Sequence, residues 1–122
     1  MTKQAVATGL AEISRPQWDA FINKFSRQNQ GRLTRLELFG ELGAQEFEQH
    51  LPLNGVTLDA SGSAAPRLAI MLGDGTRHLT HTVTDVARLL PKCAADGVDE
   101  ALEIESANGE KTLLRFEALP RP

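Results

Sequence analysis

One stripe of large apolar side chains limits what this chain can fold into. Trp18, Phe21, Ile22 and Phe25 recur at the spacing i, i+3, i+4 and i+7, which places them along one side of an α-helix. Such a helix is stable only when its stripe packs against another element, and each buried side chain then contributes roughly 1.5–3 kcal/mol. We therefore predict an amphipathic helix over about residues 15–30, with the core organised around it.

The two ends of this helix carry their own signals. Ser14 and Gln17 have the S-x-x-Q spacing of a capping box, and Pro16 falls in the first turn, where a missing N–H costs nothing. Gly31 follows the last residue of the periodic segment and is typical of a helix stop. The sequence therefore predicts both where the helix begins and where it ends.

The remainder of the chain reads as short strands separated by turns. Separate strands are predicted over 33–39, 45–51 and 56–60, with Pro52 ending the second at an edge or a bend. Arg67 to Leu72 and Arg77 to Val83 form a predicted hairpin around the turn Gly73-Asp74-Gly75. Residues 5–13 give a weaker signal for an opening strand. Residues 84–92 fit either a strand or a helical turn, which Pro91 ends in both cases.

The last hairpin has a register that hydrophobic matching decides. A two-residue Asn108-Gly109 turn sets Leu114 opposite Glu103, which is a poor match. A three-residue loop with a bulge at Gly109 instead pairs Ile104 with Thr112 and Leu102 with Leu114, so we predict the longer loop.

These elements predict one α+β domain over residues 1–122. The N-terminal helix packs on a small, mostly antiparallel six-stranded β-barrel or strongly bent sheet. The chain has 122 residues, which is close to the commonest size of a single domain.

Charge and cysteine content narrow the function classes. The net charge of −3 argues against a general nucleic-acid binder. Residues 1–35 nevertheless carry +4, from six Lys/Arg against two acidic residues, and the basic residues that could contact nucleic acid there are Arg15, Lys24, Arg27, Arg32 and Arg35. Residues 36–122 carry −7, and this polarity is either a solvated surface or a means of steering a partner. One cysteine, no signal peptide and no apolar segment of membrane-spanning length predict a cytoplasmic protein without a membrane partner.

No established catalytic, phosphate-binding or dinucleotide-binding motif is present, so no catalytic residue, cofactor or metal is predicted. His78 and His81 are expected on opposite faces of a strand, so we do not expect them to share a metal. His81 shares the apolar face of its strand, where it is either a paired core histidine or a group lining a small cavity. His50, Glu46 and Glu48 share one strand face, either as a solvated acidic edge or as a surface metal site.

Several segments spread over residues 12–118 resemble a bacterial family of small proteins known only as a domain of unknown function. The matching segments are QW at 17–18, FS at 25–26, LGAQ at 42–45, LPLNGV at 51–56, HLTH at 78–81, ALEIES at 101–106, NG at 108–109 and TLLRF at 112–116. The resemblance implies a soluble bacterial domain that stands alone. It implies no activity.

Two functions from different classes follow. The first is a non-enzymatic binding or assembly module. It would bind a protein partner or form a homodimer, through an exposed strand edge or an apolar patch around Leu113 and the edge formed by 47–53. The alternative is a small-ligand-binding protein or enzyme that uses His81 in a barrel cavity with nearby carboxylates.

Overall fold

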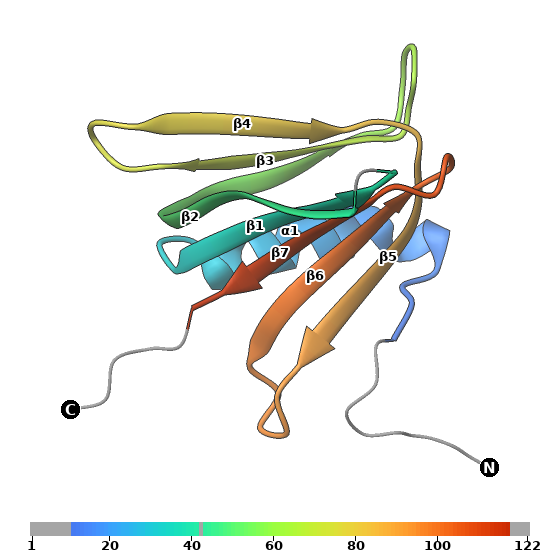
Figure 1. The fold of residues 1–122 in the computed structure, drawn as a ribbon. Coiled ribbons are helices and arrows are strands. Elements are labelled where there is room, and N and C mark those ends of the chain that lie inside the picture. The colour runs from blue at the N-terminus through green and yellow to red at the C-terminus, as the bar shows by residue number, and fades with distance from the viewer. Residues whose placement is uncertain (1–10, 42, 118–122) are drawn as a thin grey trace.

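The computed structural model describes residues 11–41 and 43–117, without the side chains of residues 46–49. It contains one short 3₁₀ turn, one α-helix and seven strands (Figure 1). Their bounds are η1 Arg15–Gln17, α1 Trp18–Asn29, β1 Leu33–Gly40, β2 Gly43–Asp59, β3 Arg67–Gly73, β4 His78–Val83, β5 Val86–Cys93, β6 Asp99–Ser106 and β7 Lys111–Phe116.

The seven strands form one open antiparallel sheet with the order β4-β3-β2-β1-β7-β6-β5. Figure 1 shows β3 and β4 running at a steep angle to β5, β6 and β7, with α1 behind the middle of the sheet. The prediction of an α+β fold with a helix on an antiparallel sheet is confirmed. The closed six-stranded barrel is not what the structure shows, because the outer strands β4 and β5 are not paired with each other.

Strand β2 accounts for most of this shape. Its first part pairs with β1 and its second part, from Leu53, pairs with β3, so one long strand replaces the two that the sequence predicted. Pro52 therefore marks the point where β2 changes partner and not a strand end, and β2 lies inside the sheet and not at an edge. Register irregularities opposite Arg35 and Glu37 of β1, and beside Gly55 of β2 itself, bend β2 further, because bulges increase the local twist.

Helix α1 buries the stripe that the sequence predicted. Trp18, Ile22 and Phe25 are each at most 3% exposed, and Phe21 packs half-buried against the same core. The capping box is wrong, because the side chain of Ser14 makes no capping hydrogen bond and the helix starts with a 3₁₀ turn instead.

A close contact fixes α1 over the bend in β2. The Ser26 hydroxyl accepts a hydrogen bond of 3.0 Å from the backbone N–H of Val56, which is 2% exposed. A Cβ atom at Gly55 would lie 3.3 Å from the Ser26 Oγ, so glycine at this position lets the helix approach the strand. The helix ends at Asn29, ahead of Gly31 as predicted.

A buried polar network ties the end of α1 to the start of β6. Asn29 is 2% exposed, and its Nδ2 donates to the backbone C=O of Phe25 at 2.9 Å and to Asp99 Oδ2 at 2.8 Å. The Nη1 of Arg32 donates to Asn29 Oδ1 at 2.9 Å and to the Asp99 C=O at 2.7 Å. The Arg32 guanidinium also lies 4.3 Å from the centre of the Phe116 ring. Sequence patterns did not indicate this network, because its members are about 70 residues apart.

The hairpins follow local sequence closely. In the β6–β7 hairpin Ile104 pairs with Thr112 and Leu102 with Leu114, which confirms the predicted three-residue loop. Gly109 takes a φ of +93° there, as a bulge of this kind requires.

In the β3–β4 turn, backbone and hydroxyl donors of Thr76 lower the pKa of Asp74 to about 2.

Residues 86–93 form strand β5, which settles the ambiguity between strand and helical turn. The prediction that Pro91 ends this segment is wrong: β5 continues to Cys93, because an edge strand tolerates a residue without an N–H. The predicted strand over 5–13 falls mostly outside the described residues. At its end, the N–H of Ile13 donates to the C=O of Leu89 at 2.9 Å.

Candidate functional site

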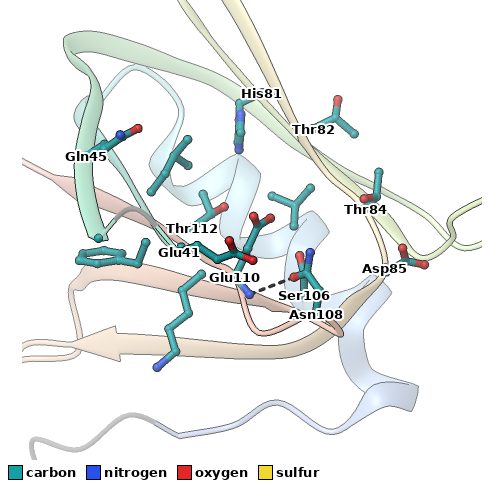
Figure 2. Close-up of a pocket in the computed structure, with 16 residues that line it drawn as sticks. Glu41, Gln45, His81, Thr82, Thr84, Asp85, Ser106, Asn108, Glu110 and Thr112 are labelled. Carbon is teal, nitrogen blue, oxygen red and sulfur yellow. Dashed lines mark hydrogen bonds between the residues drawn. The ribbon is translucent and has the colours of Figure 1, made fainter.

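A cleft of about 530 Å³ lies between β4 and the tips of the β1–β2 and β6–β7 hairpins. A second hollow of about 480 Å³ adjoins it at the same two hairpin tips. Figure 2 shows the first cleft, whose lining side chains come from three separate parts of the chain, residues 38–45, 81–85 and 106–112. The tertiary fold therefore creates a place where groups that are distant in sequence meet.

The floor of the cleft belongs to the interior face of the sheet. Leu38 pairs with Thr112, and the register of β4 opposes His81 to Ile70 and Val83 to Leu68. Thr112 is 6% exposed, so its hydroxyl is a buried polar group at an otherwise apolar floor. A ligand in the cleft would meet an apolar surface with one hydroxyl in it.

His81 extends from β4 into the cleft, on the side that faces Glu41, Glu110 and Thr112 (Figure 2). It is half-buried, and burial lowers the pKa of its imidazole below 6.5 because desolvation disfavours the charged form. At neutral pH the ring is therefore uncharged, with one nitrogen as donor and the other as acceptor. This placement favours the predicted cavity-lining role over that of an enclosed core residue.

Three carboxylates border the mouth of the cleft. Glu41 comes from the β1–β2 turn, Asp85 from the corner between β4 and β5, and Glu110 from the residue before β7. Lys111 is the one cationic side chain in the lining, so carboxylates outnumber it three to one.

These carboxylates differ from several others in the protein. Arg67 pairs with Asp59, Arg88 with Glu12 and Glu105, and Arg115 with Glu37. None of the ion pairs found among the described residues includes the three carboxylates of the cleft. Their charge is therefore available to a ligand.

Local turn chemistry positions Glu110. The Asn108 side chain accepts a hydrogen bond of 3.0 Å from the Glu110 N–H, and the Glu110 C=O accepts one of 2.9 Å from the Ser106 N–H. The Glu110 side chain lies over Gly40, where an added Cβ atom would be 3.5 Å from Oε2. The hairpin loop thus directs this carboxylate toward the neighbouring β1–β2 turn.

The other residues singled out from the sequence do not join the cleft. His78 is exposed on the opposite face of β4 from His81, as the alternation predicted. His50 has a φ of +65°, and its Nδ1 lies 2.7 Å from Glu117 Oε2. The register skips His50, so the alternation that would place it with Glu46 and Glu48 is broken, and the side chains of those two glutamates lie outside the described set.

Leu113 is half-buried, opposite Glu37 on one side and Glu103 on the other. It is therefore not the centre of an exposed apolar patch. Groups of three or more His, Cys, Asp or Glu side chains suited to a metal ion are absent from the described part of the chain.

Sequence reasoning missed most of the cleft. Glu41, Asp85 and Glu110 lie in or beside turns, where acidic residues are common for reasons of local structure. Gln45 and Thr112 lie on strands that looked only structural. The one signal that pointed to the cleft was a histidine on the apolar face of a strand.

A comparison with protein-family models matches residues 10–121 to a family of unknown function (DUF5335). The chain belongs to this family. The match confirms the resemblance drawn from the sequence, and it covers every element from η1 to β7, so the cleft lies within the DUF5335 domain. Comparisons with curated proteins and with solved structures gave no match. Within the described residues, no helix of this DUF5335 protein is both long and apolar enough to cross a membrane.

Proposed function

We propose that this protein is a non-enzymatic binding module whose cleft takes a small organic cation, such as an amine. The observation that carries the proposal is the set of three carboxylates at the mouth of a cleft with an apolar floor. A volume of about 530 Å³ falls in the range of small-molecule sites, and such sites combine apolar walls with a few polar groups that fix orientation.

Charge determines the proposed ligand class. Glu41, Asp85 and Glu110 oppose one ammonium group, that of Lys111, so the lining attracts a positive ligand. His81 is uncharged at neutral pH, so it adds no positive charge that would repel such a ligand. An anionic ligand would meet three carboxylates without a compensating group of guanidinium type, so it is disfavoured.

The alternative, an enzyme that uses His81, draws on the same cleft. An imidazole with a lowered pKa beside carboxylates is a group that accepts a proton from a bound substrate. Binding without turnover supports the module, and conversion of a bound amine with loss of that conversion in His81→Gln supports the enzyme.

The surface side chains give less support to a role in protein assembly than the cleft gives to ligand binding. Leu33 and Val98 are the large hydrophobic residues found exposed among those the structure describes, and they belong to different elements. Nucleic-acid binding is also disfavoured, since Arg32, one of the five basic residues, is committed to Asn29 and Asp99.

Isothermal titration with putrescine, choline and arginine tests the proposal, with glycerol and acetate as neutral and anionic comparisons. Glu41→Gln and Glu110→Gln keep the side-chain shape and remove the charge. Each should weaken cation binding by about 1 kcal/mol, or roughly fivefold, as partly exposed ion pairs do. Glu100→Gln is the matched control, because Glu100 is exposed and lies outside the cleft.

The pattern of binding decides the matter. Weaker cation binding in the cleft variants, with the control unchanged, supports the proposal. Equal binding of cations and acetate, or equal affinities in the cleft variants and the control, contradicts it.

A further inference from the structure

Strand β4 is an open edge of the sheet. It pairs with β3 on one side, and no other described strand pairs with it. Its register with β3 is regular from Gly73–His78 to Leu68–Val83. The six residues of β4 include no proline and no lysine, arginine, aspartate or glutamate. Edge strands normally carry such residues or bulges, because an unprotected edge pairs with other chains.

The opposite edge, β5, carries the protection that β4 lacks. It contains Pro91, the charged side chains of Arg88 and Lys92, and two register irregularities. The C=O of Leu89 also accepts a hydrogen bond of 2.9 Å from the N–H of Ile13. Strand addition at β5 is therefore blocked in several ways, whereas addition at β4 is not.

The backbone groups that β4 offers follow from the hairpin. The Asp74 N–H donates to the Arg77 C=O at 2.9 Å, and hydrogen-bonded and non-bonded pairs alternate from there along an antiparallel ladder. This alternation turns the N–H and C=O groups of His78, Thr80 and Thr82 away from β3. The side chains of all three are exposed, so no bulky apolar group shields the edge.

We propose that β4 pairs in antiparallel fashion with β4 of a second copy of this chain. Because β4 carries no carboxylate, ammonium or guanidinium group, two copies meet without the like-charge repulsion that guards most edges. Because β5 is protected, head-to-tail pairing of β4 with β5 is disfavoured, which favours the symmetric pairing of two β4 edges. Such an interface closes at two copies and does not extend into a filament.

The geometry of the fold restricts the register. Leu79, His81 and Val83 face the interior of the sheet, and residues directly opposite in an antiparallel pair point to the same side. For the two interiors to lie on the same side, the two-fold axis must pass beside a residue and not between two residues. An axis beside Thr80 uses all three outward residues, because it pairs Thr80 with Thr80 and His78 with Thr82, whereas an axis beside His81 leaves His78 opposite Thr84, outside the strand. We therefore place the axis beside Thr80, where the two copies of Thr80 lie directly opposite each other.

The dimer should be weak. One short strand pair buries less than the roughly 1,200 Å² of a standard interface, so association depends on protein concentration. This inference does not require the ligand cleft to be occupied, and its test measures no ligand.

Sedimentation velocity over a concentration series provides the test, with Thr80→Pro as the main variant. Proline removes the outward N–H of residue 80 and leaves the hydrogen bonds to β3 in place. Thr80→Ala is the matched control, since it keeps the N–H. We expect a monomer–dimer equilibrium in the wild type and in Thr80→Ala, and a dissociation constant raised about tenfold or more in Thr80→Pro.

Two further variants keep the proposal falsifiable if Thr80→Pro unfolds. Thr82→Lys places like charges at the interface and should also raise the dissociation constant. In a Cys93→Ser background, oxidised Thr80→Cys should form a disulfide-linked dimer, whereas Thr57→Cys, on the exposed side of β2, should not.

Three results would overturn the proposal. They are a wild-type monomer at all concentrations up to about 1 mM, a dimer of equal strength in Thr80→Pro, Thr80→Ala and Thr82→Lys, and a series of larger species instead of a dimer.

Discussion

Replacement of Asn29 by alanine should cost this protein much of its stability. Asn29 is 2% exposed and takes part in three hydrogen bonds, to the Phe25 C=O, to Asp99 Oδ2 and from Arg32 Nη1. The bond to the backbone contributes about 0.5–1.5 kcal/mol, and each bond to a charged group about 1.5–3 kcal/mol. Asp99 is only half-buried, so water replaces part of what it loses. We therefore expect a loss of about 2–4 kcal/mol in the free energy of unfolding.

Urea denaturation followed by tryptophan fluorescence measures this loss, because Trp18 is the one tryptophan and is buried in the core. Gln28→Ala is the matched control. Gln28 donates to the same Asp99 Oδ2, at 3.3 Å, but is exposed, so its removal should cost less than about 0.5 kcal/mol. Equal losses in the two variants, or a loss below about 1 kcal/mol in Asn29→Ala, would refute the view that this network anchors the helix.

Three other predictions concern single groups. Ser26→Ala should lower the free energy of unfolding in urea by about 1–3 kcal/mol, because the buried N–H of Val56 loses its acceptor; an unchanged midpoint would contradict this. Gly109→Ala should cost about 1 kcal/mol by the same measurement, since a φ of +93° strains any other residue, and a neutral result would count against the bulge. Burial lowers the pKa of His81, so the unfolded chain binds its proton more readily. The stability from this group is full above a pH of about 6.5 and is lost as the pH falls through the folded pKa. The difference in the free energy of unfolding between wild type and His81→Gln, measured by urea denaturation between about pH 7.5 and pH 5, should become less favourable to the wild type as the pH falls. A difference that stays constant over this range would contradict this account.

Local patterns predicted the pieces whose causes are local. The stripe from Trp18 to Phe25 gave the helix, since its period alone requires one buried side. The register of the β6–β7 hairpin followed from hydrophobic matching and from the conformational freedom of Gly109. The capping box is a local prediction that failed. The Ser14 hydroxyl makes no capping hydrogen bond to a backbone N–H, because the chain enters the helix through a 3₁₀ turn.

Long-range pairing decided the rest of the fold. Pro52 is a turn signal by itself, yet β2 continues through it because β1 and β3 take up its two halves in succession. Pro91 is likewise tolerated because β5 lies at the sheet edge, which no local window reveals. The first outcome merges two predicted strands into β2, and the sheet stays open because β4 and β5 are not paired with each other.

The sequence by itself determined an α+β fold with a buried helix stripe, and it pointed to His81 through a polar residue on an apolar strand face. Only the tertiary structure brought Glu41, Asp85 and Glu110 to the same cleft and Asn29 to Asp99. The physical reason is distance along the chain. Periodicity and turn chemistry act over a few residues, whereas the meeting of separate turns depends on how a long bent strand folds the whole sheet.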